Sequence, residues 1–130
     1  MAPEHVDLME RIATAWNEGD WDRVRDGWHD DVVFEDNLLP DGGVYRGKEA
    51  AWRRMEEVRA LVGDWKIATE SIMDAGAEVV WITRITSRKD EDTPPADFLS
   101  GTAFSFEGNR AIRIRWFPTP EAALEAVGLS

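Results

Sequence analysis

The sequence contains no cysteine. This absence excludes a disulfide framework, a thiolate metal site and a cysteine nucleophile. Histidine is scarce too: His5 and His29 lie far apart, with no carboxylate at ligand spacing, so we expect no metal site. Long apolar runs are also missing, and no stretch approaches the roughly 20 apolar residues that a membrane span requires.

Positive charge is in short supply. Fifteen Lys and Arg residues against 26 Asp and Glu leave a formal net charge of −11. Nucleic acids and anionic membranes attract the opposite sign, so we expect neither as a partner. The segment 1–16 is acidic and has no apolar stretch, which is untypical of a signal peptide and predicts a cytoplasmic location. Gly42 and Gly43 lie in a turn without the spacing of a P-loop or dinucleotide-binding motif, so we expect no cofactor.

A chain of 130 residues has the commonest size for one domain, and we expect a single domain over 1–130. Apolar residues at helical spacing predict helices over 4–18 and 48–62, with a short helix between them that carries Trp21, Val24 and Trp28. Alternating or β-branched residues predict strands at 32–36, 65–73, 79–88, 98–106 and 112–116.

Turn-rich composition predicts loops at 37–47 and 89–95. A last helix is expected to begin at Pro120, with Thr119 as its N-cap. Three helices followed by a run of strands predict an α+β fold, with the helices on one face of a bent sheet. Gly101 and Ala103 are small residues on the other face of the 98–106 strand, so we predict a homodimer through that outer sheet face.

Four segments carry motifs of a known family, namely Trp16–Trp21, His29–Asp36, Gly43–Ala50 and Phe117–Leu129. Together they resemble the nuclear transport factor 2-like superfamily, and within it the SnoaL-like polyketide cyclases and ketosteroid isomerase-like proteins, over nearly the whole chain. The resemblance implies a cone-shaped, strongly curved, antiparallel or mixed sheet. Three N-terminal helices would close an apolar pocket, and a short C-terminal helix would follow. Because this fold hosts many functions, the resemblance implies a fold more firmly than a function.

Asp36 is the main catalytic candidate. Alternation places Asp36 on the same face as Val32 and Phe34, which is expected to look inward. The resemblance places Asp36 where ketosteroid isomerases carry their general base. A carboxylate among tryptophans would be desolvated, and its pKa would rise toward the range of a useful base. Alternatively, Asp36 caps the loop at Asn37 or faces water at the strand end.

The rest of a ketosteroid isomerase site is not reproduced. Arg11 and Thr102 stand where the resemblance places the oxyanion-hole residues, so we expect Thr102 and Tyr45 to supply any donors instead. Limonene epoxide hydrolases use an Asp-Arg-Asp arrangement, whereas the 79–88 strand contains Arg84 and no carboxylate. We expect His29 to serve the end of the helix before it rather than catalysis.

The seven tryptophans predict an aromatic pocket, or else a filled core. Arg115 either holds an acidic group in the pocket or faces outward, because the alternation of the 112–116 strand permits both. The predicted ligand-binding residues are Trp16, Phe34, Trp52, Met55, Trp81, Phe98, Phe104, Arg115 and Phe117.

Three functions follow from these observations. The first is a cofactor-independent proton-transfer enzyme of isomerase, cyclase or dehydratase type, acting on a small apolar or polyketide-like carbonyl compound with Asp36 as general base. The second is a non-catalytic module that binds a small apolar molecule. The third is an epoxide-type hydrolase, in which Asp36 activates water and Asn37 orients it.

Overall fold

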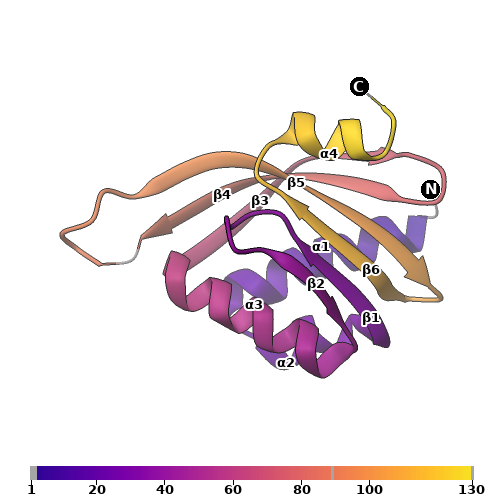
Figure 1. Cartoon of the computed structure of the whole chain (residues 1–130), viewed down its shortest axis with the longest axis horizontal. Helices are drawn as coiled ribbons and strands as arrows, with labels where there is room; N and C mark the ends of the chain where they lie inside the picture. Colours follow the sequence, from indigo (N-terminus) through magenta and orange to yellow (C-terminus); the bar gives the residue numbers. More distant parts are fainter. Residues whose placement is uncertain (1–2, 89, 130) are drawn as a thin grey trace.

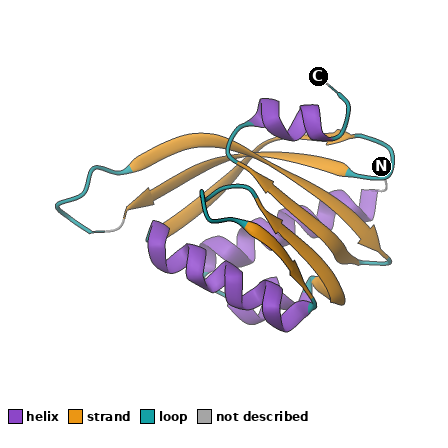
Figure 2. Ribbon diagram, viewed as in Figure 1, coloured by secondary structure: helices purple, strands orange, loops and turns teal. Residues whose placement is uncertain are grey.

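The computed structural model describes residues 3–88 and 90–129 and builds them into a strongly curved sheet with helices on both faces (Figures 1 and 2). In chain order the elements are α1 (Pro3–Glu18), α2 (Trp21–Asp26), β1 (Trp28–Asp36), β2 (Gly43–Arg46), α3 (Lys48–Val62), β3 (Asp64–Asp74), β4 (Val79–Arg88), β5 (Ala96–Glu107), β6 (Arg110–Phe117) and α4 (Pro120–Ala126).

The described residues form one mixed sheet in the order β2-β1-β6-β5-β4-β3. β1 runs parallel to β6, with Phe34 opposite Ile114, and the other neighbouring strands are antiparallel. Among these residues β2 and β3 are edge strands, so the sheet curves without closing. The predicted α+β class with a mixed sheet is therefore confirmed.

Most predicted elements are confirmed, and their ends follow local chemistry. Thr119 accepts a hydrogen bond from the main-chain N–H of Ala122 and caps α4, whose first residue is Pro120 as predicted. Two predictions were wrong. Trp28 begins β1 instead of ending the second helix, and the predicted loop 37–47 contains the short strand β2, which pairs with β1.

The main core lies between the sheet and the helices α1, α2 and α3. Val32, Phe34 and Asp36 are all buried on the β1 face that α3 covers, as their alternation predicted. Met9, Met55 and many aromatic rings fill the same space. This inner layer contains the cavity described below.

On the opposite face of the sheet, the short helix α4 packs mainly on β5 (Figure 1). Gly101 lies beneath this helix, and a Cβ atom built there would collide with the Cβ of Ala123. The small residue at this position therefore makes room for the chain's own C-terminal helix. The homodimer itself stays a prediction.

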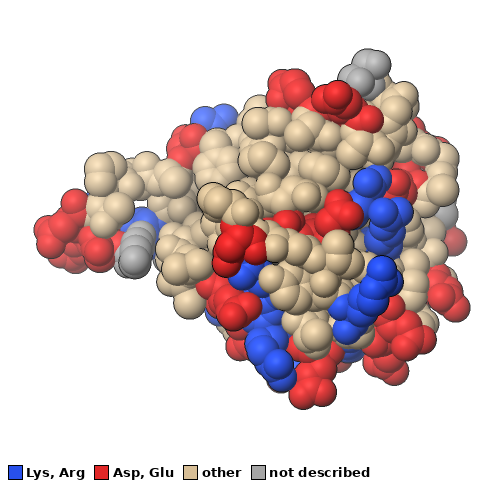
Figure 3. Space-filling view, viewed as in Figure 1, with Lys and Arg blue, Asp and Glu red and all other residues tan. Residues whose placement is uncertain are grey.

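On the face shown in Figure 3, groups of acidic and basic side chains are separated by larger areas of other residues. The connector between β4 and β5 projects from the body at the left of the view, and its residues 90–95 are exposed as predicted. No helix in the described ranges is long and apolar enough to cross a membrane.

Candidate ligand-binding site

A cavity of about 50 Å³ lies between the inner face of the sheet and the three N-terminal helices. The helices contribute aliphatic and aromatic walls, and the strands contribute aromatic rings and hydroxyl groups. No charged side chain belongs to the lining in the described part of the chain. The lining residues are Ile12, Trp16, Val24, Trp28, Leu38, Met55, Trp65, Ile67, Trp81, Thr83, Ile85, Ser100, Thr102, Phe104, Ile114, Trp116 and Phe117.

Interlocking rings hold this wall in place. The ring of Trp65 lies 5.3 Å from that of Trp16 and 5.2 Å from that of Trp116, with interplanar angles of 67° and 50°. Trp81 contacts Phe104 at 5.8 Å. Edge-on and tilted contacts of this kind are favourable beyond the area they bury, so the wall is stiff.

The polar groups of the wall are neutral. The hydroxyls of Thr83 and Ser100 lie 3.2 Å apart and share one hydrogen bond, in which either can donate. Thr102 is buried on the same face of β5. The indole Nε1 of Trp65 is buried and has no hydrogen-bond partner among the described residues. The cavity thus offers donors without offering charge.

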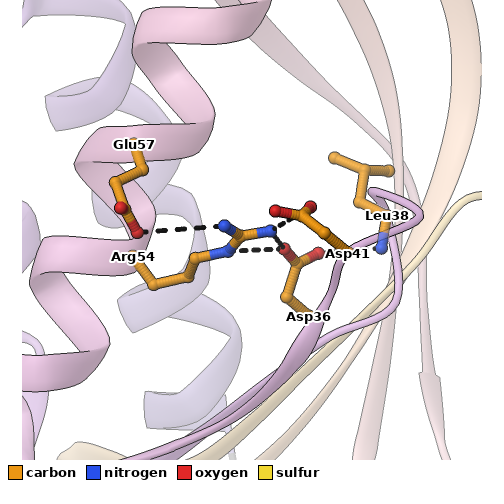
Figure 4. A network of polar contacts seen from close by, with 5 residues as sticks. All are labelled: Asp36, Leu38, Asp41, Arg54 and Glu57. Carbon is orange, nitrogen blue, oxygen red and sulfur yellow. Dashed lines mark hydrogen bonds and ion pairs between the residues drawn. The ribbon is translucent and has the colours of Figure 1, made fainter.

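A second polar group, the Asp36–Arg54–Asp41 network, lies beside the cavity (Figure 4). Arg54 comes from α3 and is 5% exposed, and Asp36 at the end of β1 is 2% exposed. The Nε and Nη2 atoms of Arg54 lie 2.9 and 2.8 Å from Oδ2 of Asp36, and Nη2 also donates to Oδ1 of Asp41 at 2.9 Å. Arg54 therefore connects both ends of the segment 37–42 to α3.

Asp36 is engaged on its other oxygen as well. Oδ1 accepts a hydrogen bond of 2.8 Å from the main-chain N–H of Leu38, whose side chain lines the cavity. Gly42 closes the same segment: a Cβ there would collide with the main-chain oxygen of Asp36, so only glycine fits. The segment 37–42 is thus a tight turn fixed at both ends.

These contacts shift the pKa values of Arg54 and Asp41. The hydrogen bond that Arg54 donates to Asp41 and the ion pair with Asp36 raise the pKa of Arg54 above its ordinary value, against the opposing effect of burial. In return, the Arg54 hydrogen bond and charge hold the pKa of Asp41 below its ordinary value of 3.8. Arg54 is therefore a permanent buried cation.

The structure places only part of the predicted site together. The predicted residues that line the cavity are Trp16, Met55, Trp81, Thr102, Phe104 and Phe117. The predicted residues outside the lining are Phe34, Asp36, Tyr45, Trp52, Phe98 and Arg115. The second group does not line this cavity, and its part in ligand binding or catalysis stays a prediction.

Each of those residues has another environment. Phe34 and Trp52 pack in the core, Trp52 against the ring of Trp28. The ring of Tyr45 lies 5.5 Å from the guanidinium of Arg54. Phe98 is half-buried on β5, at the edge of the core cluster.

The positions of Asp36 and Asn37 bear on two of the sequence-based alternatives, a solvent-exposed Asp36 and an epoxide-type hydrolase. Asp36 is not a residue that faces water, and it caps the turn at Leu38 rather than at Asn37. Asn37, the water-orienting residue of the hydrolase hypothesis, is exposed and donates through Nδ2 to Glu35. The geometry gives the hydrolase hypothesis no support.

Arg115 and His29 face away from the cavity. Arg115 forms a two-point ion pair with Glu78, in which Nε donates to Oε2 at 3.0 Å and Nη2 donates to Oε1 at 2.6 Å. Of the two orientations considered for Arg115, the outward one is therefore observed. His29 lies within β1, and its Nδ1 accepts a hydrogen bond from the main-chain N–H of Asp31. A role at a helix end was therefore wrong for His29.

Sequence reasoning missed Arg54 and Trp65. A signal existed for Arg54, because it lies three residues after Ala51 and four before Val58 on the apolar stripe of α3. A charged residue at such a position indicates a buried partner. Trp65 begins the alternation of the predicted strand 65–73, but no pattern in the sequence indicates an unpaired indole N–H.

Comparison with known families agrees with this architecture. The SnoaL-like domain family matches residues 9–115, which is most of the chain. The chain belongs to the SnoaL-like domain family. No curated protein sequence matches this SnoaL-like domain significantly.

Solved structures share the fold of the SnoaL-like domain at low sequence identity. A putative SnoaL-like polyketide cyclase from a Jannaschia species has a TM-score of 0.75 at 17% identity, over 100% of this chain and 96% of that one. A hypothetical protein with a ketosteroid isomerase-like fold from Catenulispora acidiphila, in complex with trimethylamine, has a TM-score of 0.74 at 15% identity, over 100% of this chain and 96% of that one. TerC, co-crystallised with polyporic acid, has 0.76 at 15% identity, over 96% and 98%. These similarities establish the fold.

Proposed function

We propose that this SnoaL-like domain binds a small, neutral, largely apolar molecule in the cavity walled by its tryptophans. The observation that supports this proposal is the composition of the cavity lining. The lining presents apolar surface and neutral hydrogen-bond donors, and none of its described residues has a charged side chain. An ionic ligand would lose its hydration without gaining a counter-charge, which is costly. An apolar ligand gains about 25 cal/mol for each Å² that it buries.

The size of the cavity limits the ligand. Its volume of about 50 Å³ is small beside the roughly 300–1,000 Å³ of sites for drug-sized molecules, and a cavity of about 150 Å³ is known to take benzene. A ligand as large as a substituted benzene therefore has to displace part of the wall. Leu38 is the lining residue on the turn 37–42, outside every helix and strand, so we propose this turn as the mouth.

Titration with matched ligands tests this proposal. Indole N–H signals in a ¹H–¹⁵N correlation spectrum report on the tryptophans of the wall. We expect neutral acetophenone to shift the signals of Trp16, Trp65 and Trp81, and benzoate of similar size to leave them unchanged. If benzoate shifts them as strongly as acetophenone, or if no neutral ligand shifts any of them, the proposal fails.

A cavity-filling variant supplies the control. Ser100→Leu places extra carbon atoms in the cavity, whereas Ser105→Leu places the same side chain on the other face of the same strand. Binding of acetophenone should be lost in Ser100→Leu and kept in Ser105→Leu. Thermal unfolding of both variants checks that each is folded at the temperature of the titration.

Proton transfer by Asp36 is a second candidate. Its support is proximity: the carboxylate is buried and bonded to the main chain of Leu38, which lines the cavity. With the turn displaced, Asp36 would take a proton α to a ligand carbonyl, and Thr102 or Tyr45 would stabilise the developing oxyanion.

Deuterium incorporation tests the second candidate. Wild type should accelerate exchange of the methyl protons of acetophenone in D₂O, and Asp36→Asn should abolish the acceleration while it still binds the ketone. Asp41→Asn, which changes the other carboxylate on Arg54, serves as the matched variant. Exchange at the buffer rate in wild type would rule out proton transfer on this ketone and leave ligand binding as the function.

A further inference from the structure

Among the described residues, Nε1 of Trp65 is the one buried side-chain nitrogen or oxygen atom without a hydrogen-bond partner. The residue is 6% exposed, its ring lines the cavity, and its Nε1–H donates to no protein atom in that part of the chain. A buried donor left unpaired is costly, and nearly all buried donors in folded proteins are paired. An unpaired Trp65 N–H in the cavity wall therefore calls for a physical explanation.

In two neighbouring tryptophans the indole N–H group is paired within the protein. Nε1 of Trp16 donates to the main-chain oxygen of Trp65 at 2.9 Å, and Nε1 of Trp81 donates to Oγ1 of Thr69 at 2.9 Å. Both also line the cavity. The apolar wall thus does not prevent pairing of an indole N–H, and Trp65 differs from two residues in the same environment.

We infer that Trp65 is the hydrogen-bond donor for the ligand, and that the ligand class is a neutral molecule with an acceptor oxygen, such as a ketone, ester or ether. This inference rests on the proposed function, because it concerns the same cavity. A hydrocarbon would leave the indole N–H unpaired, whereas a carbonyl oxygen would pair it. A protonated amine, which has donors but no acceptor, would not pair it.

The hydroxyl pair of Thr83 and Ser100 adds to this chemistry. In their shared hydrogen bond one hydroxyl donates, so the hydrogen of the other hydroxyl is available to a further acceptor. Thr102 on the same strand face brings another hydroxyl to the lining. Donors thus come from β3 through Trp65 and from β4 and β5 through the hydroxyls, which suits a ligand with one or two acceptor oxygens.

A matched ligand pair isolates the hydrogen bond. Acetophenone and α-methylstyrene have nearly the same shape, but only the ketone carries an acceptor. Their dissociation constants are measured for wild type, Trp65→Phe and Trp81→Phe. Trp81→Phe is the control, because it removes a similar ring area from the same cavity but an N–H that is already paired within the protein.

We expect the ratio of ketone to alkene affinity to fall about 3- to 10-fold in Trp65→Phe, which corresponds to one neutral hydrogen bond. The ratio should stay within about twofold in Trp81→Phe. Using a ratio cancels changes in shape and stability that affect both ligands equally. In wild type, the indole N–H signal of Trp65 should move downfield with the ketone and not with the alkene, which is a readout taken on the unaltered protein.

The outcomes separate the two proposals. If both ligands bind and the ratio is unchanged in Trp65→Phe, with no downfield shift in wild type, the donor role of Trp65 is overturned and the proposed function stands. If neither ligand binds wild type, the proposed function fails, and the inference fails with it. A fall in the ratio in both tryptophan variants would also overturn the specific role of Trp65.

Discussion

Removal of the Arg54 guanidinium is the sharpest test of how this fold holds the turn beside its cavity. Arg54→Met keeps the apolar length of the side chain and deletes the guanidinium. Asp36 would then be a carboxylate at 2% exposure that keeps only the hydrogen bond from Leu38. Loss of one partner from a buried pair costs about 3–5 kcal/mol. A domain of this size has roughly 5–15 kcal/mol in total, so the loss should be plain.

The cost should depend on the charge of residue 36. In Asp36→Asn the amide oxygen still accepts from the N–H of Leu38, but no buried negative charge needs the guanidinium. Arg54→Met should then cost about 1 kcal/mol, the usual value of a neutral hydrogen bond. The two backgrounds therefore differ by about 2–4 kcal/mol in the free energy of unfolding, as an interaction energy between contacting residues.

Urea unfolding followed by tryptophan fluorescence measures these differences, because tryptophans from several elements lie in the core. Asp41→Asn is the control: Asp41 binds the same guanidinium, but its side chain is 73% exposed. Its loss should destabilise the protein much less than Arg54→Met does. If Arg54→Met costs no more than Asp41→Asn, or costs the same with Asn as with Asp at position 36, the buried pair does not hold the turn as argued.

Three further predictions concern α4 and the turn. Gly101→Ala should destabilise the protein by about 1–3 kcal/mol through overpacking against α4, and Ala123→Gly in the same chain should recover part of the loss in urea unfolding. Thr119→Ala removes the N-cap of α4 and should cost about 1 kcal/mol in the same assay, whereas Thr119→Ser should cost little. Because Arg54 lowers the pKa of Asp41 below 3.8, the stabilisation from Asp41 is present above that pH and is lost as the pH falls through the lowered value. The difference in unfolding midpoint between wild type and Asp41→Asn should therefore shrink toward zero between pH 4 and pH 2, and a constant difference would contradict the ion pair.

Residue patterns were enough to predict most of the fold. The apolar stripe of α1, the β-branched run of β4 and the cap at Thr119 are local signals, and each led to an element close to the observed one. β2 was missed because it is a short edge strand whose residues also read as a turn. Trp28 was misplaced because an aromatic residue after a short helix continues the helical spacing equally well.

The site was predicted only in part, because neither pairing nor cavity shape is a local property. Alternation placed Asp36 and Thr102 on inward faces, and both are buried there. It could not show that Arg54 from α3 reaches Asp36, because the two meet across the layer between helix and sheet.

What the sequence determined by itself is the class of the fold, the inward faces of the strands and an interior rich in aromatic residues. These depend on hydrophobic periodicity and composition, which act within one element at a time. Only the tertiary structure decided which aromatic residues enclose the cavity, that α4 covers Gly101, and that the N–H of Trp65 has no partner among the described residues. Hydrogen-bond pairing and close packing arise between elements far apart in the chain, so they exist only once the layers have come together.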